Sequence, residues 1–105
     1  MKVIVEGHTY KLAHHGASGV DGLPCEHLQF INKVKQEDGA LVTVADGTTN
    51  EEVLRVLIDR MKYLQARMSC RENAIVITKL EESLMWLEKR TADRNARGVE
   101  GAEKA

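Results

Sequence analysis

The chain has 105 residues, of which 15 are basic and 16 are acidic, giving a formal net charge of −1 at pH 7. This length is typical of one domain, and the balanced charge excludes the broad positive field of a general DNA-binding protein. The opening MKVIVEGH is too short an apolar run for a signal peptide, no stretch reaches membrane-spanning length, and the two cysteines are expected to be reduced, so we expect a cytosolic protein.

The sequence offers few large side chains for a core. Its aromatic residues are Tyr10, Phe30, Tyr63 and Trp86. A small domain also hides a smaller share of its surface than a large one. We therefore expect the chain to gain stability by burying a helix face against a second copy.

Residues 1–47 predict a small antiparallel β-sheet, because short alternating runs are separated by turn residues. Lys2–Glu6 and Thr9–Leu12 are expected to form a hairpin around Gly7. His27–Val34 is the predicted first strand of a second pair.

The second strand of that pair is predicted over Ala40–Ala45, after a turn at Glu37–Gly39, because Asp-Gly is a strong turn signal. Between the two pairs, Ala13–Glu26 is rich in glycine and contains Pro24. We expect this segment to be a mobile loop.

Residues 48–105 predict a helical hairpin, and both helix starts carry a capping signal. Thr49 precedes Glu52 by three residues, and Ser69 precedes Glu72 in the same way, so each pair fits a capping box. Apolar residues recur at helical spacing after each signal. They are Val53, Leu57, Met61 and Leu64 in the first helix, and Ile77, Leu80, Leu84 and Leu87 in the second.

The second helix is predicted over Cys70–Arg97, because Gly98 is a natural helix stop. At about 1.5 Å per residue, such a helix is roughly 40 Å long. A shorter first helix cannot cover it fully, so its free end should pack on another subunit or bind a ligand. The fold class expected is α+β: a small N-terminal antiparallel β-sheet followed by a two-helix αα-hairpin, in one domain over 1–105 that forms an oligomer.

The C-terminal end of the second helix is the first candidate site. Arg90, Arg94 and Arg97 lie three and four residues apart on one face, and Trp86 lies one turn earlier. A planar aromatic followed by guanidinium groups suits a nucleotide, with the base or ribose on the ring and the phosphate oxygens on the arginines. The alternative is structural: these cations complement the helix macrodipole and pair with nearby acids. Those acids are Glu82, Glu88 and Asp93.

The turn between the helices, Tyr63–Asn73, is the second candidate. Exposed amides at the start of the second helix, with Arg71 and Asn73 beside them, favour an anion pocket. Asn73 can also donate to and accept from a base edge or a ribose hydroxyl. The alternative is an ordinary turn with Tyr63 half buried in the core.

Metal and catalytic sites are not expected. Zinc needs three or four converging ligands at fixed spacing, and the sequence has no CxxC or HxxxH pair, so a solvated loop is favoured for its softer ligands. The sequence also has no P-loop, GxSxG or HExxH motif, so we expect no enzyme and no cofactor. The softer ligands considered are His8, His14, His15, Cys25 and His27.

Two long stretches of the helical half resemble a known family. DGTTNEEVLRVLIDRMKYLQ and CRENAIVITKLEESLMWLEKRTADRNARGVEG are similar to phage proteins of the Thoeris anti-defence sponge family. The helical hairpin of that family is also grouped with that of certain anti-CBASS sponges. The resemblance is close over residues 46–101 and loose over the strands, and it does not extend to the loop at 13–26.

The resemblance implies a function. Thoeris is a bacterial defence system in which a TIR-domain protein converts NAD into a cyclic ADP-ribose isomer, and that messenger activates a killing effector. Members of the phage family bind the glycocyclic messenger tightly and reversibly without degrading it. They are homodimers that can assemble into homohexamers, with pockets between subunits, and some also bind cyclic di- or trinucleotides of CBASS at a second kind of site. A member would act in the cytoplasm of the infected bacterial host.

The resemblance also implies roles for particular residues. Tyr63, in DRMKYLQ, is expected to stack on adenine, and Asn73, in REN, to hydrogen-bond the base or ribose. Arg90 and Arg94, in KRTADR, are expected to contact the pyrophosphate.

Four further residues have secondary assignments. Arg71 and Arg97 are expected either to touch phosphate or to support the site, and Asp59 and Arg60 to form a structural pair.

One chain cannot bring all these residues to one ligand. Asn73 begins the second helix and Arg90 and Arg94 end it, about 25 Å apart at the helical rise per residue. We therefore expect each pocket to combine the inter-helix turn of one chain with the basic helix end of another. Two alternatives stay open: a helical-hairpin phage protein serving only assembly or protein–protein contact, and a hydrolase that destroys the messenger.

Overall fold

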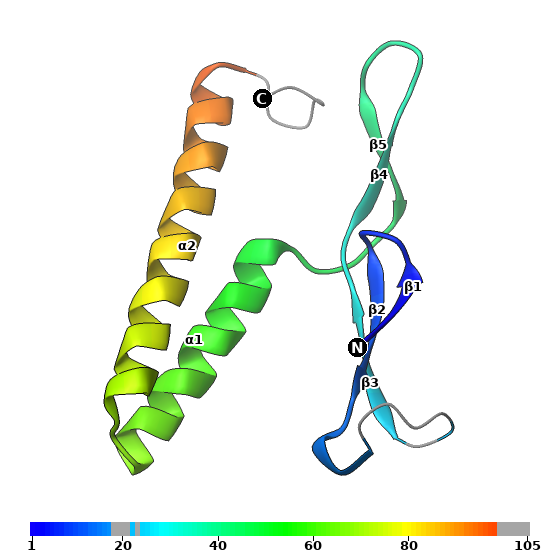
Figure 1. Ribbon diagram of the computed structural model, residues 1–105. Coiled ribbons are helices and arrows are strands. Elements are labelled where there is room, and N and C mark those ends of the chain that lie inside the picture. The colour runs from blue at the N-terminus through cyan, green and yellow to red at the C-terminus, as the bar shows by residue number, and fades with distance from the viewer. Residues whose placement is uncertain (18–21, 23, 99–105) are drawn as a thin grey trace. The chain divides into compact units, whose positions relative to one another are not determined.

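The computed structural model describes residues 1–17, 22 and 24–98 (Figure 1). Strands precede two helices, which confirms the predicted α+β class. The backbone groups into two compact units, one formed by residues 1–34 and 42–48 and the other by residues 35–41 and 49–105. The single domain over 1–105 stays a prediction. In the part of the chain that the structure describes, no helix is both long and apolar enough to cross a membrane.

The first three strands form an antiparallel sheet in the order β1-β2-β3. The strands are β1 (Lys2–Val5), β2 (Thr9–Ala13) and β3 (Cys25–Gln29). The predicted turn around Gly7 is confirmed, because Gly7 has a φ of 75°. On one face of the sheet, the rings of Tyr10 and Phe30 meet edge to face, with centroids 6.0 Å apart.

The strand predicted over His27–Val34 is wrong as one continuous element, because it divides at Phe30. The Phe30 N–H still donates to His8 O at 2.7 Å, but the next amide, Ile31 N–H, donates to Thr48 O at 2.9 Å. Thr48 N–H in turn donates to Gln29 O at 2.9 Å. The backbone thus changes its hydrogen-bond partner at this point, from the β2 side at His8 to Thr48. The second half of the predicted strand becomes β4 (Asn32–Lys35).

β4 pairs with β5 (Leu41–Ala45), and the predicted Asp-Gly turn joins them. Gly39 has a φ of 86° and donates its N–H to Gln36 O, while the Asp38 carboxylate accepts from Ala40 N–H at 2.9 Å. The residue types that predicted the turn therefore form it.

The segment predicted as a loop, Ala13–Glu26, is shorter in the structure. Ala13 belongs to β2, the last two residues belong to β3, and His15–Ala17 form one turn of 3₁₀ helix, η1. Residues 18–21 and 23 lie outside the described residues, so the mobility predicted there stays a prediction.

Helix α1 (Asn50–Arg67) begins where the sequence predicts. The Thr49 Oγ1 accepts from Glu52 N–H at 3.2 Å, which satisfies one of the free amides of the first turn. The Glu52 carboxylate accepts from Arg55 at 3.1 Å.

Helix α2 (Arg71–Ala96) begins one residue later than the capping box predicts. Cys70 is the cap, and its Sγ accepts from Asn73 N–H at 3.4 Å. Ser69, predicted as the cap, instead donates its hydroxyl to Gln65 O at 2.9 Å. The predicted stop at Gly98 is confirmed: Gly98 has a φ of 69° and donates its N–H to Asn95 O.

The two helices pack antiparallel along one seam (Figure 1). Most of the predicted stripe residues are half-buried in that seam, although Leu57 remains 44% exposed. Among the described residues of the two helices, Arg94 is the one residue that is more than nine-tenths buried. Large apolar side chains, including Val56 at 62% and Met85 at 52%, remain exposed.

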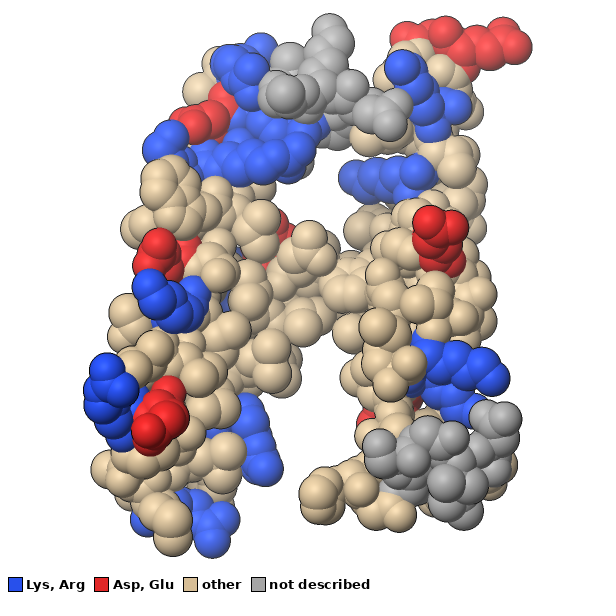
Figure 2. All heavy atoms as spheres, in the orientation of Figure 1, with Lys and Arg blue, Asp and Glu red and all other residues tan. Residues whose placement is uncertain are grey.

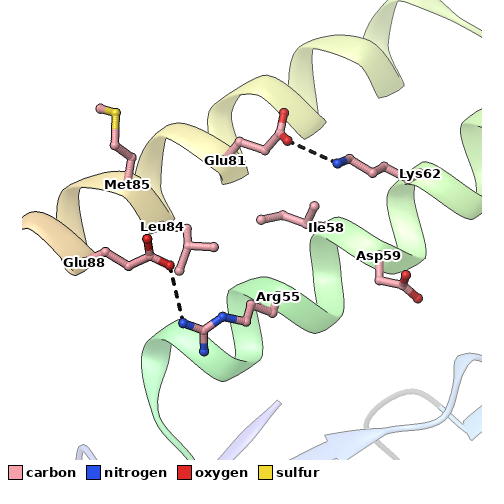
Figure 3. A pocket seen from close by; sticks show the side chains of 8 residues that line it. All are labelled: Arg55, Ile58, Asp59, Lys62, Glu81, Leu84, Met85 and Glu88. Atoms are coloured by element: carbon pink, nitrogen blue, oxygen red, sulfur yellow. Dashed lines mark hydrogen bonds and ion pairs between the residues drawn. The ribbon is translucent and has the colours of Figure 1, made fainter.

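Two ion pairs cross between the helices and fix their register (Figure 3). Arg55 contacts Glu88 at 3.4 Å, and Lys62 contacts Glu81 at 3.2 Å. The two basic residues are seven residues apart on α1, and the two acids are seven residues apart on α2. The same kind of pair therefore repeats after about two turns of each helix. Solvent-exposed pairs stabilise weakly, so we assign them mainly to register.

Gly47→Ala tests the backbone crossing beside Thr48. A Cβ at Gly47 would lie 2.5 Å from Gln29 O and 2.7 Å from the carbonyl carbon of Phe30, so the backbone would have to shift. We expect the free energy of unfolding to fall by about 1–3 kcal/mol, measured by denaturant unfolding at one protein concentration. Gly16→Ala is the matched control, because a Cβ there meets no atom within 4 Å. An equal loss in both variants would contradict the crossing as described.

Candidate ligand-binding site

The turn between α1 and α2 is closed by the side chain of Gln65. Its Oε1 accepts from Cys70 N–H at 3.0 Å, and its Nε2 donates to Cys70 O at 3.0 Å. The main chain adds a bond from Met68 N–H to Leu64 O at 2.9 Å. One amide side chain therefore pairs with both backbone groups of Cys70, which caps α2 and positions Asn73.

Asn73 lies in the first turn of α2 and is half-buried. Its main-chain N–H is used by Cys70 Sγ, which leaves the side-chain amide as the group that can meet a ligand. Arg71, two residues earlier, is exposed beside a hollow of about 290 Å³ on the surface of α2. The other residues that line this hollow are Ala74, Ile75, Thr78 and Lys79.

Tyr63 lies on the face of α1 that points away from α2. Met61 and Gln65, each two residues away, are half-buried in the seam, and two residues correspond to more than half a helical turn. The Tyr63 side chain is 56% exposed, so the alternative of a half-buried core residue is not what the structure has. The Arg67 guanidinium carbon lies 5.7 Å from its ring centroid, within cation–π range.

Basic side chains gather around the C-terminal end of α2 (Figure 2). Arg90 and Arg97 are exposed, Arg94 is 7% exposed, and Trp86 is 57% exposed. An aromatic ring and guanidinium groups therefore occur together on the last turns of this helix, as the sequence predicts.

The acids expected to neutralise this end have other partners. Glu82 pairs with Lys79 at 3.9 Å. Glu88 pairs across the seam with Arg55, and Asp93 pairs with Lys89 at 2.7 Å. The structural alternative, in which these acids serve the arginines, is thereby weakened. The favourable interaction of cations with the helix macrodipole remains.

The predicted residues do not converge within one chain. Asn73 and Arg90 are 17 residues apart on one straight helix, about 25 Å along its axis. Tyr63, on the outer face of α1, lies at the same end of the hairpin as Asn73 and far from Arg90. A ligand of dinucleotide size can touch both groups only if a second chain supplies one of them.

The sequence analysis missed a groove between the helices (Figure 3). Its volume is about 480 Å³, its floor is apolar, and the two cross-helix ion pairs lie along it. The lining residues are Arg55, Ile58, Asp59, Lys62, Glu81, Leu84, Met85 and Glu88. The seven-residue spacing of basic residues on α1 and of acids on α2 is the signal that could have revealed it. Its charges are already paired, apart from Asp59, so it is a poor match for a charged ligand.

A second hollow of about 480 Å³ continues from this groove towards the start of α1. Thr49 and Glu51 lie on one side of it, and Thr91 and Asn95 on the other. The end of α2 that a shorter α1 was expected to leave uncovered is therefore partly flanked by the start of α1.

Two further expectations concern ion pairing and metal ligands. Asp59 and Arg60 make no ion pair among the described residues, so the structural pairing expected for them is wrong. In the described part of the chain, no group of three or more metal-ligating side chains converges. His14 instead lies 2.9 Å from the Glu26 carboxylate.

Gln65→Glu tests the closure of the turn. The substitution keeps the acceptor for Cys70 N–H but places a carboxylate oxygen against Cys70 O in place of the amide donor. We expect the free energy of unfolding to fall by about 1–3 kcal/mol, read from thermal or denaturant unfolding. Gln36→Glu makes the same chemical change in an exposed turn and should have little effect. Equal stability of the two variants would show that the Gln65 amide does not close the turn.

Comparison with known proteins agrees with this architecture. The model of the family described as "Acb2/Tad1, hairpin domain" matches residues 26–92, more than half of the chain. A protein named Thoeris anti-defense 1, from Bacillus phage SBSphiJ7, is 57% identical over 58 residues, which is 54% of this chain and 41% of that protein. The matched region thus spans less than half the length of that relative. On the family match, the chain belongs to the Acb2/Tad1 hairpin-domain family.

Proposed function

We propose that this chain is a phage anti-defence protein that binds and sequesters a TIR-derived glycocyclic ADP-ribose messenger without degrading it. Family membership and the name of the phage relative support the anti-defence role. The observation that carries the binding role is the basic end of α2. There Arg90 and Arg97 are exposed near Trp86, while the neighbouring acids pair with other cations.

The ligand's chemistry matches the side chains available. A guanidinium group can donate two parallel hydrogen bonds to pyrophosphate oxygens, a task for which we propose Arg90, which is exposed, and Arg94, which is largely buried in the single chain. Tyr63 would stack on adenine, and Asn73 would donate to and accept from the base or a ribose hydroxyl.

We assign Arg97 and Arg71 secondary roles in this site. Arg97 lies one turn beyond the proposed pyrophosphate contacts, and Arg71 lies beside Asn73 at the start of α2, so each would contact phosphate or support the site. The site needs no metal and no cofactor.

We propose that each pocket lies between chains, in a homodimer or homohexamer. The inter-helix turn of one chain would supply Tyr63 and Asn73, and the basic helix end of another would supply Arg90 and Arg94. The exposed apolar side chains of the hairpin support this assembly, because a partner subunit would remove them from water. The protein would act in the cytoplasm of the infected bacterial host.

Sequestration accounts for the function without catalysis. A protein that only binds the messenger lowers its free concentration, and affinity alone must compete with the effector. Cyclic di- or trinucleotides of CBASS are further ligands that a second site would bind. The exposed apolar faces also favour a second candidate function, a hairpin protein that serves only assembly or protein–protein contact.

A thermal-shift screen distinguishes these functions. The ligands are glycocyclic ADP-ribose isomers, ordinary cyclic ADP-ribose, NAD, and cyclic di- and trinucleotides. Ligand at 100 times its dissociation constant should add about 2.7 kcal/mol of stability, and chromatography of the heat-released ligand should recover it unchanged. Altered ligand would identify an enzyme. No shift with any nucleotide would leave the assembly function in its place.

Variants locate the pocket within the same experiment. Arg90→Ala and Asn73→Ala should each weaken binding roughly 10- to 100-fold, because each removes a hydrogen bond to a charged or polar ligand group. Lys89→Ala is the matched control, since Lys89 neighbours Arg90 but pairs with Asp93. Equal weakening by Lys89→Ala and Arg90→Ala would indicate a general loss of positive charge and contradict a defined pocket.

A further inference from the structure

The basic residues of the helical hairpin divide by the partners they have. Lys62, Lys79 and Lys89 each pair with a carboxylate, and Arg55 pairs with two. Within residues 49–98, a further set of arginines makes no ion pair with a carboxylate. These are Arg60, Arg67, Arg71, Arg90 and Arg97. The functions described above use three of them and leave Arg60 and Arg67 without a role.

Arg67 differs from Arg60 in what it contacts. Its guanidinium group lies over the ring of Tyr63, 5.7 Å from the centroid, and both side chains are exposed. Arg60 lies one turn before Tyr63 on the same face of α1, is also exposed, and among the described residues has no ion-pair partner. Arg67 is therefore the arginine that is in cation–π contact with the Tyr63 ring, and Arg60 is the comparable arginine without such a contact in the described part of the chain.

This face of α1 lies away from the ion-paired groove. Arg55 and Lys62 point to the groove, and Arg60 is five residues from the first and two from the second. At 3.6 residues per turn, these separations place Arg60 well away from the groove-facing cations, and Arg67, seven residues after Arg60, lies on nearly the same face as Arg60. The acids Glu81 and Glu88, which neutralise the groove, therefore do not serve this face.

We propose that Arg67 belongs to a nucleotide-binding platform with Tyr63, as the residue that positions the ring and presents positive charge beside the stacked base. This inference rests on the proposed function and adds to its site a residue that neither the sequence motifs nor the family match assigns. A guanidinium group is planar, so it can hold an aromatic ring in one orientation while its outer N–H groups donate to phosphate oxygens. The ligand class is a purine nucleotide.

Substitution by lysine separates stacking from charge. Arg67→Lys keeps the charge but loses the planar contact, so we expect it to weaken binding of glycocyclic ADP-ribose roughly two- to fivefold. Arg67→Gln loses both the charge and the guanidinium group and should weaken binding at least as much. Arg60→Lys and Arg60→Gln are matched controls on the same face and should change affinity less than twofold. Isothermal titration of the full chain measures all four. Indistinguishable affinities for the two lysine variants and the unmodified protein would overturn the proposal.

A second readout follows the Tyr63 ring directly. With 3-fluorotyrosine in place of tyrosine, the chain carries two ¹⁹F signals, from Tyr10 and Tyr63, and Tyr63→Phe assigns them. We expect Arg67→Lys to shift the Tyr63 signal without ligand, while the Tyr10 signal stays in place. AMP at millimolar concentration should then move the Tyr63 signal in the unmodified protein and move it less in Arg67→Lys.

The outcomes separate this inference from the proposed function. If no cyclic ADP-ribose isomer binds but AMP moves the Tyr63 signal in an Arg67-dependent way, the messenger assignment fails and the platform stands. If an isomer binds and requires Arg90, yet the Arg67 variants bind like the unmodified protein, the platform fails and the function stands. If no isomer binds and AMP does not move the Tyr63 signal, both are overturned.

Discussion

Two helices packed against each other can bury side chains along one seam only, and this limit underlies the other properties of the hairpin. The seam leaves its own apolar residues half-buried, and Val56, Met85 and Trp86 lie on surfaces that α1 and α2 cannot cover for each other. Removing such surface from water is the main favourable term in folding and association. A second chain is the simplest source of that cover, and an inter-chain pocket is then available without further structure.

The charged residues of the hairpin fall into those that form ion pairs and those that do not. Carboxylates of α2 pair with Arg55 and with lysines, and two of these pairs repeat at seven residues to fix the helix register. The arginines that remain carry the planar, multi-donor group best suited to phosphate and to stacked rings. A lysine in the same place would be a more flexible point charge, so arginine is the better residue for these exposed faces.

The sequence predicts those elements whose signals are local. Thr49 caps α1, Asp38 and Gly39 form the β4–β5 turn, and Gly98 ends α2, because each conformation depends on residues a few positions away. The break at Phe30 and the use of Glu88 by Arg55 were not predicted, since both depend on partners that are distant in sequence. For the candidate site, the residue types and their helical faces can be predicted from the sequence. How these residues would meet around one ligand cannot, because in the proposed pocket it depends on contacts between two chains.

A pocket built between chains couples affinity to assembly. In the proposed pocket, the free energy of association would hold Tyr63 and Arg90 at their separation before the ligand arrives, so the ligand would not have to offset the cost of ordering them. The cation–π contact between Arg67 and Tyr63 acts in the same direction within one chain, since a ring already held in place loses less conformational entropy on stacking. A protein that acts by sequestration competes with the effector through affinity alone. Ordering the pocket before the ligand binds, both between chains and within one chain, is the physical means by which so small a chain would reach a high affinity.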